Sequence, residues 1–157
     1  MDAFYIITKN NVLESVDFSQ AIKLVTIGPR SFNKCEVLTM FVAPSSLIVI
    51  QYAAFSNCTS LNELDFGDAT NLKTVQDLAF SGCEALTTAT IPSSVTSFRN
   101  YVFSNFQAGG WKPLLNLKSI DIDGDNLALA IRLCVWYPNY QTQELSKRLI
   151  YLYSVDP

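Results

Sequence analysis

The chain of 157 residues contains no histidine, and only 16% of its residues are charged. Without histidine, Ser-His-Asp and Cys-His catalysis are excluded, and so are imidazole acid-base chemistry at neutral pH and the commonest zinc ligand. An average soluble domain has roughly 25% charged residues. Hydrophobic residues make up 49% of the chain, so intrinsic disorder is not expected. We expect no enzyme activity, no cofactor and no bound metal.

The sequence also lacks a basic surface charge and a long apolar run. Its isoelectric point is about 4.8 and its formal net charge is -3, which argues against nucleic acid or an anionic membrane as a partner. The longest apolar stretch, 47–55, is interrupted by Gln51 and falls short of the roughly 20 residues that span a bilayer. No basic and apolar leader begins the chain. We therefore expect a cytoplasmic protein, or an extracellular or cell-surface one if the chain is a fragment of a secreted protein.

An internal repeat dominates what is present. One position of the repeat holds Phe32, Phe55, Phe80 and Phe103, which are spaced by 23, 25 and 23 residues. The position three residues later holds Cys35, Cys58, Cys83 and Phe106. An L-x-x-h-x-h pattern, with h hydrophobic, begins at Leu13, Leu38, Leu61, Leu86 and Leu117. An L-x-x-I pattern precedes the phenylalanines, so the unit is L-x-x-I-x-x-x-A-F-x-x-C-x-x-L-x-x-h-x-h-P. A period of this length predicts a solenoid.

Each part of the unit predicts a local structure. The alternation in L-x-x-h-x-h is typical of a short strand with every second residue buried. The A-F-x-x-C segment predicts a short helical turn with its phenylalanine and cysteine on one side. Pro44 and Pro92 end their strands because proline cannot donate to a β-ladder. One unit buries too little apolar surface to fold alone, so successive strands should stack into one parallel sheet.

The segments AAFSNCTSLNEL, LAFSGCEALTTATIPSSVTSF and YVFSNF carry a family resemblance. Together with weaker copies from Leu24 to Ile122, they resemble the repeats of the BspA-like leucine-rich-repeat family. The resemblance implies an α/β fold, a right-handed leucine-rich-repeat solenoid whose parallel β-sheet forms the concave face. It also implies a role in surface adhesion and protein binding, and no enzyme activity.

The repeat sets the expected domain boundaries. Residues 1–126 should form a solenoid of about five coils, which starts mid-repeat at Ala3-Phe4 without a polar cap. We expect either a fragment of a longer repeat protein or an N-terminal coil that docks on a partner. Beyond the repeat, apolar residues follow helical spacing at Leu127, Ile131, Cys134 and Leu145, Leu149, Leu152. Residues 127–157 are therefore expected to form a helical C-terminal cap, or the start of a further helical domain.

Two sequence motifs resemble metal-binding sites, but neither predicts one. Three of the four cysteines share one repeat position, which predicts a ladder of buried free thiols and not metal ligands or disulfides. The acidic segment 121–126 resembles a calcium loop, but Asn126 stands where glycine is needed and Arg132 where glutamate is needed. It is expected to be a turn.

The outward residues of the predicted sheet remain as candidates for binding. They alternate with the buried positions and form one continuous set, called the stripe below. The stripe consists of Glu14, Ser15, Asp17, Met40, Val42, Glu63, Asp65, Thr88, Thr90, Ser119 and Asp121. Near it, eight extra residues lengthen the last repeat and include Trp111 in a segment rich in glycine, which predicts a loop. Trp111 either anchors a partner or folds back over the edge of the solenoid.

The first hypothesis is a non-catalytic protein-binding module that uses the stripe and the Trp111 loop. Because the stripe combines acids with an apolar patch at Met40 and Val42, a protein with a basic surface is the expected partner. The alternatives are a structural subunit or spacer in a larger assembly, and a fragment of an adhesion ectodomain.

Overall fold

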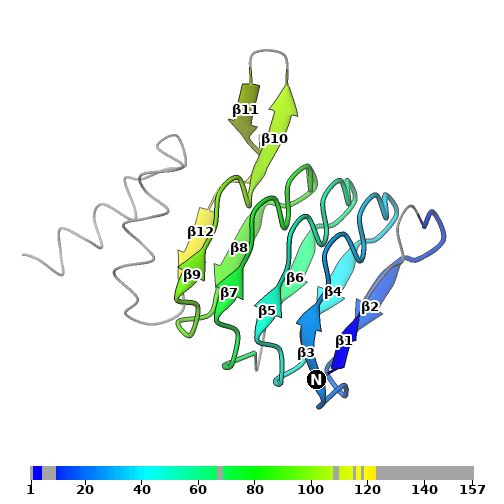
Figure 1. Ribbon diagram of the computed structural model, residues 1–157. Helices are drawn as coiled ribbons and strands as arrows, with labels where there is room; N and C mark the ends of the chain where they lie inside the picture. Colours follow the sequence, from blue (N-terminus) through cyan, green and yellow to red (C-terminus); the bar gives the residue numbers. More distant parts are fainter. Residues whose placement is uncertain are drawn as a thin grey trace, which may run out of the picture.

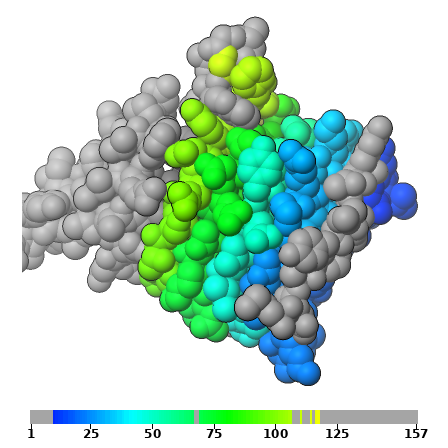
Figure 2. All heavy atoms as spheres, in the orientation of Figure 1, coloured from blue at the N-terminus to red at the C-terminus, as the bar shows by residue number. Residues whose placement is uncertain are grey.

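Each repeat forms one coil of a solenoid, and successive coils add strands to two parallel sheets (Figure 1). The computed structural model describes residues 2–4, 10–66, 69–107, 110–114, 116–117 and 119–122. In the space-filling view the coils form adjoining bands that follow the sequence from one end of the stack to the other (Figure 2).

The first sheet is built from the L-x-x-h-x-h segments, as predicted. Its strands, in spatial order, are β2 (Ser15–Asp17), β4 (Met40–Val42), β6 (Glu63–Asp65), β8 (Thr88–Ile91) and β12 (Ser119–Ile122). The ladders β2-β4-β6 and β8-β12 are parallel, and β6 contacts β8. Val16, Phe41 and Leu64 lie directly opposite one another and contribute to the core. All five predicted strands are confirmed.

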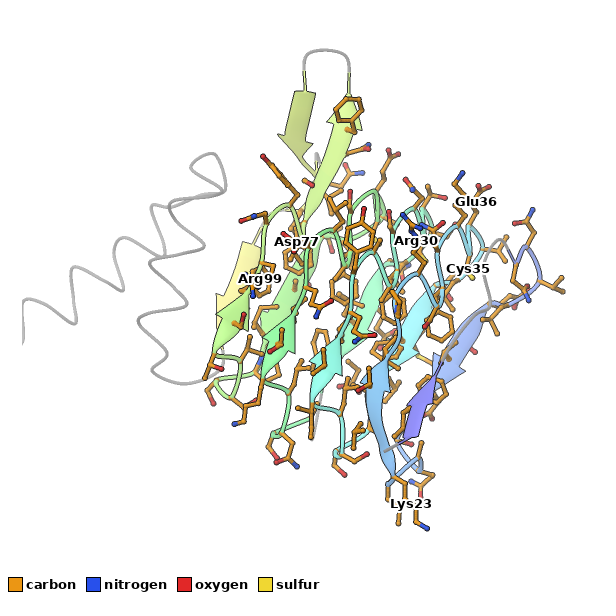
Figure 3. All side chains as sticks on the ribbon, in the orientation of Figure 1. Lys23, Arg30, Cys35, Glu36, Asp77 and Arg99 are labelled. Atoms are coloured by element: carbon orange, nitrogen blue, oxygen red, sulfur yellow. The ribbon has the colours of Figure 1, made fainter. Side chains whose placement is uncertain are left out.

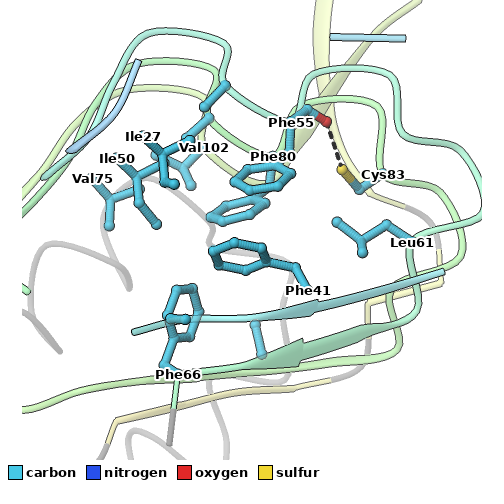
Figure 4. Close-up of a cluster of buried hydrophobic side chains, with 14 of the residues drawn as sticks. Ile27, Phe41, Ile50, Phe55, Leu61, Phe66, Val75, Phe80, Cys83 and Val102 are labelled. Atoms are coloured by element: carbon cyan, nitrogen blue, oxygen red, sulfur yellow. Dashed lines mark hydrogen bonds between the residues drawn. The ribbon is translucent and has the colours of Figure 1, made fainter. Parts of the chain in front are cut away.

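A second parallel sheet, which the sequence analysis did not predict, runs along the other side of the coils. It comprises β1 (Asp2–Phe4), β3 (Leu24–Ile27), β5 (Val49–Ile50), β7 (Thr74–Val75) and β9 (Ser97–Phe98). Four of these strands come from the L-x-x-I segments. Their last residues are Ile27, Ile50, Val75 and Phe98, all buried. The core therefore lies between two sheets (Figure 4).

The predicted helical turn at A-F-x-x-C is wrong, because these segments are turns with left-handed residues. Two residues before each repeat phenylalanine, φ is positive at Arg30, Ala53, Leu78 and Tyr101. Two residues after it, φ is positive at Lys34, Asn57 and Gly82. A right-handed helix requires negative φ throughout, so neither position can belong to one.

Hydrogen bonds between coils explain why a turn replaces the helix. The N–H groups of Ala53, Phe55 and Asn57 donate to carbonyl oxygens of the next coil at 3.0, 2.8 and 2.7 Å. The previous coil repeats this pattern at Arg30, Phe32 and Lys34, and the following coil repeats it at Leu78, Phe80 and Gly82. A helix would direct these N–H groups to its own carbonyls and leave the neighbouring coil without donors. The turns thus form a third ladder across the stack, called the turn ladder below.

Phenylalanine rings stack through the core along the same axis. The centroids of Phe32 and Phe55 lie 4.9 Å apart, those of Phe55 and Phe80 lie 5.2 Å apart, and those of Phe80 and Phe103 lie 5.6 Å apart. Their planes differ by 11°, 12° and 16°, so the four rings form one nearly parallel column. Phe41 packs against Phe55 from the first sheet at 4.6 Å (Figure 4).

The described residues form strands and turns and contain no helix, so the α/β class expected from the resemblance is not supported for them. The helical cap expected at 127–157 lies outside the described residues. The parallel-strand solenoid itself is confirmed, with turns and a second sheet in place of helices.

The extra length of the last repeat belongs to a β-hairpin, where we predicted a loop. β10 (Ser104–Gln107) and β11 (Gly110–Pro113) pair antiparallel and project beyond the coils (Figure 1). The coil resumes at Leu114, which is buried and whose C=O accepts the N–H of Leu117 at 3.3 Å. The same bond joins Leu61 to Cys58 at 3.0 Å, so Leu114 takes the place of the repeat cysteine.

Candidate functional site

The stripe residues carried by β2, β4, β6 and β8 lie on the outer face of the first sheet, where the sequence analysis placed them. The acidic and hydroxyl side chains of the stripe are exposed at Glu14, Ser15, Asp17, Glu63, Asp65, Thr88 and Thr90. Met40 and Val42 are half-buried on β4. Ser119 and Asp121 lie on β12, opposite Thr88 and Thr90.

Strand register aligns the stripe into two rows across the sheet. Ser15, Met40 and Glu63 lie opposite one another in the first row. In the second row Asp17, Val42 and Asp65 lie opposite one another. Neighbouring strands are about 4.8 Å apart, so each apolar residue of β4 lies between two polar ones.

This arrangement gives the stripe an apolar centre flanked by carboxylates. Met40 and Val42 offer contact area for an aliphatic or aromatic side chain. Asp17 and Asp65 flank Val42 on both sides, and Glu63 lies beside Met40. Carboxylates at this spacing attract cations and disfavour a second acidic surface.

Hydrogen bonds fix the β2 edge of the stripe. The Ser19 N–H donates to Asp17 Oδ1 at 2.8 Å, and this bond holds the pKa of the Asp17 carboxyl below its usual value. Glu14, which precedes β2, is held by Thr39 of the next coil. The N–H and the hydroxyl of Thr39 donate to the Glu14 carbonyl at 2.7 and 2.9 Å. Asp17 is therefore ionised at neutral pH, and the backbone at Glu14 is held to the next coil.

The hairpin is the second feature that could contact a partner. Trp111 lies on β11 opposite Phe106 on β10. The repeat register places Phe106 at the cysteine position, which is fully buried in the three preceding coils, yet the side chain of Phe106 is 67% exposed. Sequence reasoning singled out Trp111 and missed Phe106. The extra eight residues of the last repeat were the sequence signal for an exposed Phe106, because this length lets Leu114 take the buried position instead.

The base of the hairpin is attached to the preceding coil. Asn105 Nδ2 donates to Glu84 Oε1 at 2.6 Å, and Asn116 Nδ2 donates to the Glu84 carbonyl at 2.8 Å. Glu84 thus contacts both the hairpin and the segment that follows it. These bonds hold the base of the hairpin against the preceding coil.

Comparison with known proteins identifies the repeat. The profile of the BspA type leucine rich repeat region matches residues 3–110 in six copies. The chain belongs to the BspA-type leucine-rich repeat family. No curated protein matches it.

Solved structures of leucine-rich repeat proteins are similar to this BspA-type chain. A leucine-rich repeat protein from Bacteroides capillosus is 28% identical with a TM-score of 0.53, and the match covers 64% of this chain and 64% of that one. The chain thus spans slightly less than two thirds of that protein. The leucine rich repeat protein of T. pallidum is 19% identical with a TM-score of 0.50, covering 74% of this chain and 72% of that one. The second likeness bears on the fold alone.

The cysteines of this BspA-type solenoid form the predicted ladder of buried thiols. Cys35, Cys58 and Cys83 form no disulfide and are fully buried. The thiols of Cys58 and Cys83 donate to the carbonyls of Phe32 and Phe55 at 3.0 and 3.1 Å, the second of these bonds being drawn in Figure 4. Burial raises the pKa of the Cys35 thiol, and raises that of Cys83 well above its usual value.

These three thiols are expected to be inert in the folded protein. Thiolate is the reactive form, and burial both suppresses it and blocks access. We expect Ellman's reagent to modify Cys35, Cys58 and Cys83 only after denaturation, and a Cys134→Ser variant isolates their signal. Rapid reaction of that variant under native conditions would contradict the buried ladder.

Neither a metal cluster nor a membrane-spanning helix is found in the described part of the BspA-type chain. Within it, no group of three or more histidine, cysteine or carboxylate side chains is arranged to hold a metal ion. Nor does that part contain a helix of the length and apolarity needed to cross a membrane.

Proposed function

We propose that the chain is a non-catalytic protein-binding module that recognises its partner through the stripe. The observation that carries the proposal is the register, which places Met40 and Val42 between strands that bear Asp17, Glu63 and Asp65. An apolar centre with an acidic border is the composition of a protein-interaction surface. Because the chain has no histidine, the stripe cannot form a Ser-His-Asp or Cys-His pair.

The stripe favours a basic, partly apolar partner segment in an extended conformation. Side chains of an extended segment alternate with period two, so the residues directly before and after an aliphatic residue at Val42 would point away from the stripe. Lysine or arginine at the next positions on the same face would lie near Asp17 and Asp65. Because these carboxylates are exposed, salt screens their attraction to charges farther away than about 10 Å at 0.1 M ionic strength, and binding should weaken as ionic strength rises.

A peptide library displayed on phage tests this proposal, because it selects binding sequences directly on the chain. We expect clones selected on the wild-type chain to be enriched in lysine or arginine beside aliphatic residues. Glu63→Lys should lower their affinity about tenfold or more, because it places a like charge beside Met40. Affinity is measured by titrating synthetic copies of the selected peptides.

Glu36→Lys is the matched control. Glu36 is exposed in the turn after Cys35, away from the first sheet, and its substitution changes the net charge equally (Figure 3). The control should leave the affinity unchanged. Peptides that bind Glu63→Lys as tightly as the wild-type chain would refute the role of the stripe.

The other roles remain predictions that no specific contact favours. These are a structural spacer or subunit, an adhesion ectodomain, and docking through the N-terminal coil. A cytoplasmic or a cell-surface location is likewise a prediction from the sequence.

A further inference from the structure

We propose that the outer face of the second sheet of one copy of this chain docks on the stripe of a second copy. The inference rests on the proposed function, because it names a partner for the same surface. The docking surface on the second sheet is called the second-sheet face below. It consists of Lys23, Val25, Ile48, Lys73 and Arg99.

The second-sheet face has an apolar centre that is open to solvent. Leu47 and Ile50 are fully buried, whereas the side chain of Ile48 between them is 41% exposed. The Ile48 N–H donates to the Val25 carbonyl, and the Lys73 N–H donates to the Ile48 carbonyl, both at 2.9 Å. Val25 is half-buried and Lys73 is exposed. Val25, Ile48 and Lys73 are therefore neighbours on three successive coils.

Charge is segregated between the two sheets. The strands β3, β5, β7 and β9, with the residues that flank them directly, carry Lys23, Lys73 and Arg99 and no acid. All three side chains are exposed, and Figure 3 shows Lys23 at the start of β3 and Arg99 beside β9. The stripe carries five acids and no base. Because the core lies between the sheets, each molecule presents a basic face on one side and an acidic face on the other.

Both faces repeat one order of side chains along the stack. On the stripe, an apolar residue of β4 lies between acids of β2 and β6. On the second-sheet face, Ile48 belongs to one coil, and Lys23 and Lys73 belong to the coils before and after it. The coils are about 4.8 Å apart, so charges two coils apart are separated by roughly 10 Å on either face. Packing of the apolar centres therefore brings lysines of one copy over carboxylates of the other.

Opposite charges favour this pairing over the symmetric alternatives. Two stripes that face each other would bring acids together, and two second-sheet faces would bring lysines together. Pairing of unlike faces is heterologous, so a dimer keeps one free stripe and one free second-sheet face. Such a contact builds open stacks or closed rings. Both faces span only a few short strands, so we expect weak association that requires a high protein concentration.

Sedimentation velocity with variants of both faces tests the proposal. We expect the wild-type chain to associate further as its concentration rises and to dissociate as salt is added. Lys73→Glu on the second-sheet face and Glu63→Lys on the stripe each place like charges across the contact, so each should weaken association about tenfold or more. Lys34→Glu is the matched control, because Lys34 is exposed in the turn ladder and its substitution changes the net charge as Lys73→Glu does. The control should associate like the wild-type chain.

A mixture of two variants identifies which surfaces meet. Ile48→Ser removes the apolar centre of the second-sheet face, and Glu63→Lys impairs the stripe, so neither variant alone should associate. An equimolar mixture retains one intact face of each kind and should form a dimer and nothing larger. Circular dichroism checks that both variants are folded. If Ile48→Ser is unfolded, Lys73→Gln replaces it, because the side chain of Lys73 is exposed.

Three outcomes would overturn the proposal: a monomeric wild-type chain at millimolar concentration, unchanged association of Lys73→Glu, or a mixture that stays monomeric. Acidic peptides that bind a monomeric chain through Lys73 would assign the second-sheet face to a different protein. The basic peptides selected on phage separate the two proposals. If the wild-type chain is monomeric yet still binds them through Glu63, only docking of the second-sheet face fails; if binding survives Glu63→Lys, the proposed function fails.

Discussion

Replacement of Phe55 by alanine is expected to lower the free energy of unfolding by about 3–5 kcal/mol. The side chain of Phe55 is fully buried and stacks between Phe32 and Phe80, with centroid distances of 4.9 and 5.2 Å. Phe41 packs on it from the first sheet. Loss of the ring interrupts the aromatic column between coils, and neighbouring backbones tied by two sheets and the turn ladder cannot close the cavity. Urea denaturation followed by circular dichroism measures the change.

Val12→Ala is the control for this experiment, since the side chain of Val12 is 84% exposed. We expect a change within about 0.5 kcal/mol for this surface position. If both variants unfold at the same urea concentration, the phenylalanine column does not hold the coils together.

Replacement of Gly82 by alanine should lower the free energy of unfolding by about 2–3 kcal/mol. Gly82 has φ of +75°, and a Cβ added there would lie 2.5 Å from Asn57 Oδ1. The N–H of Gly82 also donates to the Ser104 carbonyl at 2.7 Å, so the backbone cannot change conformation without breaking the turn ladder. Thermal and urea denaturation measure the loss.

A double-mutant cycle separates the steric clash with Asn57 from the backbone strain at positive φ. Asn57→Gly removes the side chain that the new Cβ would meet, so the combination with Gly82→Ala should cost less than the sum of the two single changes. Additive effects would show that backbone strain alone is responsible.

Lys34→Gly provides the reverse case, because the exposed Lys34 has φ of +61° and glycine there should stabilise the protein by up to about 1 kcal/mol.

Residue patterns predicted the first sheet and its register because each strand repeats the same alternation. The opposition of Met40 to Glu63 and of Val42 to Asp65 followed from counting residues in the unit. Those two pairs form the centre of the stripe. Its use as a binding surface remains a prediction, since sequence periodicity determines which side chains point outward and not what contacts them.

The second sheet was missed because its strands are too short to show alternation. β5, β7 and β9 have two residues each, and L-x-x-I suits a helix as well as a strand. Parallel pairing with neighbouring coils, which local sequence does not encode, determines the outcome.

The left-handed turns were only partly foreseeable. Gly82 and Asn57 at one repeat position are residues that tolerate positive φ, and they gave a usable signal. Arg30, Leu78 and Tyr101 at the other position gave none, because bulky residues rarely adopt positive φ. There the hydrogen bonds to the next coil outweigh the local preference.

The way in which the coil resumes after the hairpin makes this position a natural grafting point. Phe103 and Leu114 remain within hydrogen-bonding distance at 3.4 Å, although the whole hairpin separates them along the chain. Since the coil requires only that the inserted ends meet, the intervening sequence can vary without disturbing the register of Leu114 and Leu117. Foreign binding loops with similarly spaced ends could therefore be presented here on an intact solenoid.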